Sequence, residues 1–162
     1  MNVVCGWNVA NSILKKSFEE ENYITPLKLN CMVYLLYSEY LYLTREKLFN
    51  DFFEKTKYGP VVPSIYSKFG TLKTNVITRY AKDANDRIMF VRNAKFEECV
   101  SHIWEKYKNF SDDTILFYVE SGIAVSKKQY GELLSDSDIL QTEIYRNEFE
   151  LKQAKSYVKK IN

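Results

Sequence analysis

The sequence predicts a mainly α-helical, compact domain with a small β-hairpin or irregular β excursion and a long C-terminal helix. Three observations support this fold class. Apolar residues recur at helical spacing through most of the 162-residue chain, its three prolines all lie between residues 26 and 63, and neither proline nor glycine follows Gly131. A chain of this length suits one domain, which we take as residues 1–162.

Two helices are expected in the first quarter of the chain. An apolar stripe and two oppositely charged pairs at i,i+4 favour a helix over about residues 7–21. The stripe is Trp7, Ala10, Ile13, Leu14 and Phe18, and the pairs are Lys15/Glu19 and Lys16/Glu20. Thr25 and Pro26 are typical of an N-cap followed by proline at the first helical position. The following run, 27–42, is apolar on most sides, which predicts a central place in the core.

The middle of the chain contains most of the breaks. Residues 44–63 hold short aromatic runs and a Gly-Pro turn, which predict a small hairpin or an irregular excursion. Pro63 can start a short helix, and Gly70 ends it. Residues 71–93 are polar and basic, so we expect an exposed loop there, with a strand over 88–91.

Helical periodicity resumes in the second half of the chain. Apolar residues at a clean helical spacing predict helices over 96–107 and about 114–121. The last helix is expected over 137–161, beginning at a Ser137 or Asp138 cap.

The predicted last helix carries a narrow heptad seam. Its members alternate in spacing between four and three residues: Leu140, Ile144, Asn147, Leu151, Ala154, Val158 and Ile161. Acidic residues occupy the first half of this helix and basic residues the second, which matches the helix macrodipole. Two interpretations remain open. The helix packs on its own domain, or it is an interface for a partner chain or for a homodimer, with Asn147 fixing the register.

Composition argues against most catalytic chemistry. The chain has 13 Tyr, 10 Phe and 2 Trp but one histidine, His102. It has no nucleophile-elbow motif and no phosphate-binding glycine loop, so we expect no enzyme, no catalytic residues, no cofactor and no metal. Cys99 and His102, three residues apart, could form half of a metal site or a thiol and its base. We favour packing for Cys99, because a buried cysteine behaves as a small hydrophobic residue.

Cysteine usage and hydropathy indicate the compartment. Three widely spaced cysteines, with no secretory segment after Met1, argue against a disulfide framework and favour a reducing, cytoplasmic location. A mean hydropathy of −0.35 argues against a membrane protein.

Charge is unevenly distributed along the chain. Residues 68–95 contain seven basic and two acidic residues, whereas residues 96–162 contain nine basic and twelve acidic ones. Aromatic residues interleave with the cations of the basic segment, a pattern that suits single-stranded nucleic acid, with Arg79, Arg87 and Arg92 as candidate contacts. No known nucleic-acid-binding motif accompanies it, and the pI is only about 8.3, so nucleic acid is the less favoured partner.

One short motif has no purely structural explanation. The segment Lys57-Tyr58-Gly59-Pro60-Val61-Val62-Pro63 combines a turn, two prolines and an aromatic residue. A turn that leads into a helix explains its glycine and prolines but not its tyrosine or its two valines.

At this motif the chain resembles the Panacea domain family of SocA-like antitoxins and phage-associated GepA-like proteins. The resemblance covers about residues 7–121. It is carried by the motif above with Ser64-Ile65-Tyr66, by Thr25-Pro26-Leu27-Lys28-Leu29 with Leu35 and Tyr37 following, and by Val9-Ala10-Asn11 and Leu48-Phe49. A weaker match continues at Val100, Ile103, Trp104, Tyr107 and Ser111. Family members typically carry a Thr-His pair, then an acidic residue and a Trp, after the Trp104-type helix. This chain has Phe117-Tyr118 before Glu120 and no Trp there.

The resemblance implies a non-enzymatic, mostly helical antitoxin of bacteria and their phages that neutralises a toxin by direct binding. It also implies an adaptor function, in which SocA-like members deliver the toxin to a Clp protease. Alternatively, the chain is a phage-encoded inhibitor of a host defence protein. The residues expected at the partner contact are Tyr58, Gly59, Pro60, Val61, Val62, Pro63, Tyr66 and Lys28.

Overall fold

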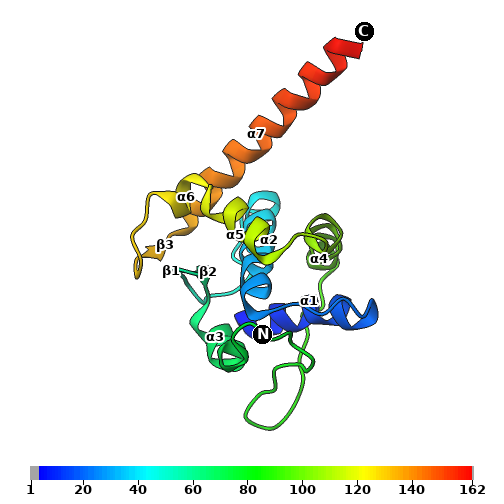
Figure 1. Cartoon of the computed structure of the whole chain (residues 1–162), viewed down its shortest axis with the longest axis vertical. Helices are drawn as coiled ribbons and strands as arrows, with labels where there is room; N and C mark the ends of the chain where they lie inside the picture. The colour runs from blue at the N-terminus through cyan, green and yellow to red at the C-terminus, as the bar shows by residue number, and fades with distance from the viewer. Residues whose placement is uncertain (1–3, 162) are drawn as a thin grey trace.

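The computed structural model describes residues 4–161, the side chain of Ile161 excepted, and confirms the predicted fold class. In chain order the elements are α1 (Gly6–Glu19), α2 (Pro26–Thr44), β1 (Phe53–Thr56), β2 (Gly59–Val61), α3 (Pro63–Phe69), the 3-10 turn η1 (Gly70–Leu72), α4 (Ala94–Tyr107), α5 (Asp112–Glu120), α6 (Ile123–Ser126), β3 (Leu133–Leu134) and α7 (Asp136–Ile161). The other elements gather around α2, and α7 extends away from this body (Figure 1).

Helix α2 is the centre of the core, as its all-round apolar sequence predicts. The Thr25 hydroxyl accepts a hydrogen bond from the Lys28 amide at 3.2 Å, and Pro26 occupies the first turn. This is the predicted cap. Helices α1, α4, α5 and α7 and strand β2 all pack on α2, so its side chains are buried on nearly every side.

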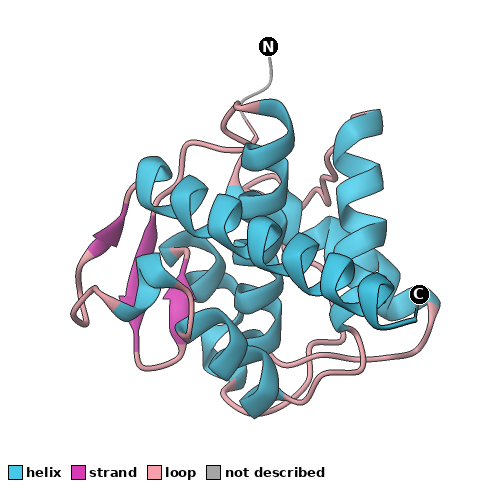
Figure 2. Ribbon diagram, turned by 90° about the horizontal axis from the view of Figure 1, so that it is seen from above, coloured by secondary structure: helices cyan, strands magenta, loops and turns pink. Residues whose placement is uncertain are grey.

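The predicted hairpin forms, and a third strand that the sequence did not predict extends it. β1 pairs antiparallel with β2, with Glu54 opposite Val61, and β3 pairs on the other side of β1. The three short strands lie at one edge of the helical body (Figure 2). Phe53 anchors the sheet, because its ring meets the rings of Tyr34 and Tyr37 on α2 edge-on at 5.3 and 5.2 Å.

The basic loop is exposed as predicted, but the strand expected over residues 88–91 does not form. Among the hydrogen bonds that hold the loop to the body, those of one buried amide are prominent. Asn11 on α1 donates to the carbonyl of Ala81 and accepts from its amide, both at 2.9 Å. Since this side chain supplies the backbone bonds that a neighbouring strand would offer, the loop is fixed without sheet pairing.

The two predicted i,i+4 pairs of α1 are absent from the ion pairs of the described residues. The carboxylate of Glu20 turns instead toward α4, where it accepts from the Trp104 indole and from the Lys108 ammonium at 2.9 Å. These hydrogen bonds lower the pKa of Glu20, with that from Lys108 the largest cause. A partner on another helix therefore replaces the local lysine.

Helix α7 has two halves with different surroundings. The first half packs on the body. Ile139 is buried, the Thr142 hydroxyl accepts from the Ala124 amide at 2.8 Å, and Arg146 pairs with buried Glu143 at 2.8 Å. Residues 148–160, which we call the distal segment, are exposed at every position. The helix is capped by Ser135, whose hydroxyl accepts from the Asp138 amide, so the expected Ser137 or Asp138 cap was wrong.

Candidate partner-binding surface

A hollow of about 510 Å³ opens between the start of α2, the hairpin turn and α3. We call it the α2–α3 hollow. Its lining is Pro26, Leu27, Asn30, Tyr58, Val61, Tyr66, Gly70, Lys73, Thr74 and Asp112. Three of these residues belong to the segment that the sequence selected. The motif therefore does more than turn the chain, because it builds one wall of an open, largely apolar recess.

The hairpin turn depends on one glycine. Gly59 has φ +89°, a left-handed conformation that favours glycine, and a Cβ there would lie 3.0 Å from the Leu116 Cδ1. The Thr56 hydroxyl fixes the turn by accepting from the Tyr58 amide and donating to the Gly59 carbonyl, each at 3.0 Å. As a result, Tyr58 is held at the tip of the turn, beside the hollow.

The second exposed ring is placed by α3. Pro63 opens this helix, as predicted, and the Ser64 hydroxyl ties it to Asp51 through a bond of 2.6 Å. One turn later the Tyr66 ring lies against the backbone of Gly70, where a Cβ would come within 3.0 Å of the ring. The missing side chain at residue 70 thus leaves room for the tyrosine.

The predicted contact segment divides into exposed and buried members. Tyr58 and Tyr66 are 45% and 54% exposed, and Pro63 is exposed as well. The intervening residues from Gly59 to Val62 are buried. Within this arrangement a partner can reach the two rings and Pro63, while the buried members support them from below.

Four polar residues of the hollow were not predicted from the sequence, and Asn30 and Asp112 are two of them. Asn30 is 4% exposed, its amide donates to the Pro26 carbonyl at 3.0 Å, and its Oδ1 has no hydrogen-bond partner. Asp112, at the start of α5, accepts from the Thr25 hydroxyl at 2.7 Å. A polar residue inside the apolar run of α2 was the available signal for Asn30. Asp112 is 87 residues from Thr25, so no local pattern could place it.

Lys28 occupies a position different from the predicted partner contact. Its side chain is 6% exposed, and its ammonium donates to the carbonyls of Lys108 and Phe110, each at 2.6 Å. Burial lowers the pKa of this ammonium, while nearby Asp112 acts in the opposite direction. The buried ammonium therefore hydrogen-bonds to carbonyls that follow the C-terminus of α4.

The predicted seam of α7 crosses both halves of the helix. Leu140, Ile144 and Asn147 are half-buried against the body, whereas Leu151 and Val158 are exposed. The side chain of Ile161, the last member of the predicted seam, lies outside the described residues. The amide of Asn147 donates to the carbonyl and carboxylate of Glu143 within the same helix, at 2.7 and 3.2 Å. That amide nitrogen is hydrogen-bonded within its own helix, and the expectation that Asn147 fixes an intermolecular register stays a prediction.

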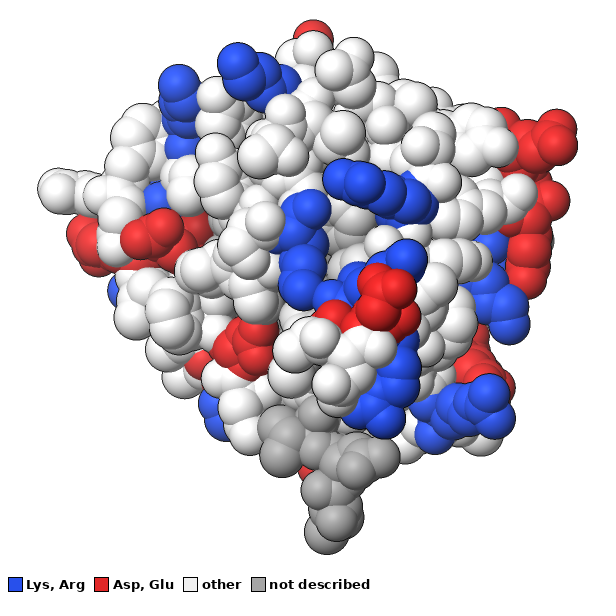
Figure 3. All heavy atoms as spheres, turned by 90° about the horizontal axis from the view of Figure 1, so that it is seen from below, with Lys and Arg blue, Asp and Glu red and all other residues white. Residues whose placement is uncertain are grey.

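The basic segment neutralises part of its own charge. Arg87 pairs with Asp83 at 3.1 Å and Lys82 with Asp86 at 3.3 Å, while Arg79 and Arg92 are exposed with no carboxylate partner among residues 4–160. On the face opposite α7, several Lys and Arg side chains lie near the middle with acidic atoms among them (Figure 3). This is a mixed surface and not a continuous basic stripe.

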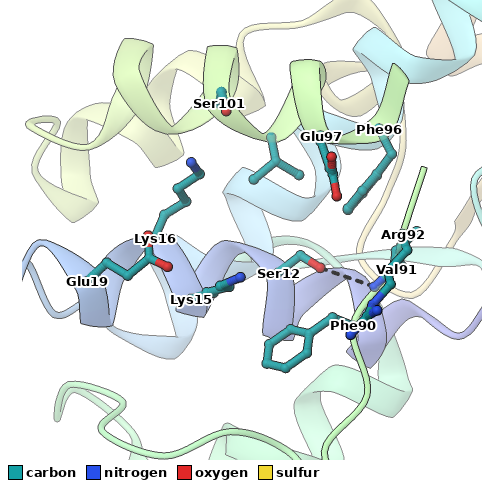
Figure 4. A pocket seen from close by; sticks show the side chains of 11 residues that line it. Ser12, Lys15, Lys16, Glu19, Phe90, Val91, Arg92, Phe96, Glu97 and Ser101 are labelled. Carbon is teal, nitrogen blue, oxygen red and sulfur yellow. Dashed lines mark hydrogen bonds between the residues drawn. The ribbon is translucent and has the colours of Figure 1, made fainter. Parts of the chain in front are cut away.

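A second hollow, of about 530 Å³, lies between α1, α4 and residues 90–92. The sequence did not predict it. Lys16 points from α1 toward α4, Glu97 points back, and the Phe90 ring closes one side (Figure 4). The Ser12 hydroxyl accepts from the Val91 amide at 3.4 Å, which joins the loop to α1. Because lysines, an arginine and glutamates all line this hollow, its charge favours neither an anionic nor a cationic ligand.

Cys99 and His102 both meet Glu39 on α2. Cys99 is buried and its thiol pKa is raised to about 12, first by desolvation and then by the Glu39 charge. His102 is exposed and bonds the Glu39 carboxylate through Nδ1. Within the described part of the chain, no three His, Cys, Asp or Glu residues are arranged to hold a metal ion. A thiol with a raised pKa is a poor nucleophile at neutral pH.

The body is thus a helical domain that presents two tyrosine rings around an apolar hollow. A family model described as "Antitoxin SocA-like, Panacea domain" matches residues 29–121, more than half of the chain and most of the hollow. The chain belongs to this antitoxin SocA-like Panacea domain family. No curated protein and no solved structure matches it significantly. None of the described helices is both long and apolar enough to cross a membrane.

Proposed function

We propose that this chain is a non-enzymatic antitoxin that neutralises a toxin by direct binding, with the α2–α3 hollow as the contact. The observation that carries the proposal is the placement of the Tyr58–Tyr66 segment. It forms the wall of a recess that has two exposed rings at its rim and the unpartnered Oδ1 of Asn30 among its lining residues. Family membership supports the antitoxin class, and the hollow supplies a surface for it.

Physical chemistry favours this surface as a protein contact. Tyrosine rings give large contact areas at a low cost in conformational entropy, and they dominate the binding energy of many interfaces. Here the Gly59 turn fixes the backbone that carries Tyr58, and the Tyr66 ring lies against Gly70. Little ordering is needed when a partner arrives, which preserves more of the contact energy as affinity.

The proposal is tested by co-expression with the product of the adjacent gene, if that product arrests growth. The chain should rescue growth and co-purify with the toxin. The double variant Tyr58→Ala/Tyr66→Ala should bind at least about 30-fold more weakly, the loss typical of an interface hot spot. Tyr130→Ala is the matched control, because this tyrosine is 69% exposed and does not line the hollow.

Two results would contradict the proposal. A folded double variant that neutralises as well as the natural chain removes the two rings from the contact. An adjacent product that is harmless and does not associate removes the toxin from the proposal. In that case a host defence protein, inhibited by a phage-encoded chain, is the next target to test against the same two variants.

Neutralisation by blocking and neutralisation by delivery to a Clp protease give different kinetics. If the chain is an adaptor, it should accelerate degradation of the toxin by purified protease and ATP. If it only blocks, the toxin should remain intact in the same reaction while its activity is lost. Both mechanisms use the same binding surface, so the tyrosine variants should impair either one.

A further inference from the structure

The distal segment of α7 has an apolar seam that nothing in the described structure covers. Leu151 and Val158 are 56% and 54% exposed, and Ala154 lies exposed between them. At spacings of three and four residues the three side chains share one face of the helix. The segment extends beyond the body into open space (Figure 1). One ion pair, between Lys106 and Glu150 at 3.4 Å, joins it to α4.

The charged residues beside the seam indicate which kind of surface could pack on it. Glu148 and Lys155 are seven residues apart and therefore lie on the same flank of the seam. Neither has an ion-pair partner among the described residues. An antiparallel copy of the same helix presents this flank in the reverse direction. Each acid then meets the base of the other copy.

We propose that two copies of this chain pair through their distal segments in antiparallel orientation. In this arrangement Leu151 of each copy faces Ala154 of the other. The twofold symmetry then places Glu148 of each copy opposite Lys155 of the other, so that two ion pairs form. A parallel pair would bring both bodies to the same end of the helices. An antiparallel pair places the bodies at opposite ends, which leaves both α2–α3 hollows open.

The association should be weak. Each copy contributes about two heptads and three small or medium apolar side chains, far less than a long coiled coil buries. We therefore expect a weak dimer that forms only as the protein concentration rises and that weakens with added salt, because the two ion pairs are exposed.

Sedimentation velocity of the full chain over a wide concentration range tests the pairing. The natural chain should change from monomer to dimer as its concentration rises. Leu151→Asp should keep the chain monomeric throughout. Phe149→Asp is the matched control, because Phe149 is 52% exposed on the same helix but on the opposite face from the seam, so dimerisation should persist. Circular dichroism checks that α7 stays helical in both variants.

Charge reversal tests the orientation. Glu148→Lys and Lys155→Glu should each weaken the dimer about fivefold or more, and the double variant should restore it, because the pairs reform with opposite signs. A natural chain that is monomeric at every concentration overturns the proposal, as do Leu151→Asp and Phe149→Asp chains that dimerise equally well. Single reversals without effect, in a dimer that Leu151→Asp abolishes, overturn the antiparallel arrangement. None of these outcomes bears on toxin binding at the hollow.

Discussion

The α2–α3 hollow and the distal segment of α7 both expose apolar side chains, but only the hollow rests on a core. Beneath Tyr58 and Tyr66 lie residues that are fully buried, such as Val62 and Ile65. Beneath Leu151 and Val158 there is only their own helix. The rings of the hollow are therefore preorganised for a partner, whereas the seam of the distal segment gains a core only when a second surface covers it.

The two regions also differ in whether they lie in the part of the chain that the family model matches. The family model covers residues 29–121, which include most of the hollow and end before α7 begins. The hollow thus belongs to the part of the chain that defines the family, and the distal segment lies outside it. If the two regions act independently, substitutions in one should leave the function of the other unchanged.

The largest expected effect is the loss of stability of the body in alkali. Burial raises the pKa of Tyr34 to about 12, and it raises the pKa values of Tyr37 and Tyr107 as well, each first through desolvation. In the unfolded chain these phenols ionise near pH 10, so the folded state binds more protons above that pH and stability falls as pH rises. The loss should approach about 1.4 kcal/mol per pH unit for each of the three tyrosines.

Urea unfolding between pH 9 and 12 measures this loss. Tyr34→Phe is a clean variant, because the Tyr34 hydroxyl is buried without a partner and its removal should cost little at neutral pH. The variant should lose less stability per pH unit than the natural chain. A stability that is flat through pH 11 would contradict the burial of these hydroxyls. The distal segment has no buried tyrosine, so this loss of stability should arise in the body alone.

The next largest expected effect is a difference between the two halves of α7 in how much they contribute to the free energy of unfolding. Ile139→Ala leaves a cavity in the body and should lower the free energy of unfolding by about 2–4 kcal/mol. Leu151→Ala removes an exposed side chain and should change it by less than about 0.5 kcal/mol at concentrations where the chain is monomeric. Equal losses from both variants, in parallel urea titrations, would show that the distal segment is covered by its own body.

Local patterns predicted the longer helices and the hairpin, because periodicity, caps and prolines act over a few residues, but they did not predict the short helix α6. The Thr25 cap, the Pro63 start and the Gly59 turn all formed as expected. The third strand was missed because its partner β1 is distant in sequence. For the same reason, the sequence did not reveal that Lys28 is held by carbonyls some 80 residues away or that Asp112 completes the hollow.

A substitution at Gly70 should test whether the position of the Tyr66 ring matters for binding at the hollow. Gly70→Ala keeps φ at −60°, an ordinary helical value, but its Cβ would lie 3.0 Å from the Tyr66 ring. Stability should change by less than about 1 kcal/mol because the ring can rotate away. Affinity for the toxin should nevertheless fall about tenfold, since the ring is no longer held in place. Titration calorimetry beside Tyr66→Ala checks this, and an affinity equal to that of the natural chain would show that the ring position is unimportant.

Hydrogen–deuterium exchange of the chain, alone and bound to the proposed toxin, tests whether the hollow is the contact. Binding should slow the exchange of amides in residues 57–75, which form the hairpin turn, α3 and the edge of the hollow. Protection confined to residues 148–160, or to the basic loop at residues 76–92, with exchange around the hollow unchanged, would contradict it.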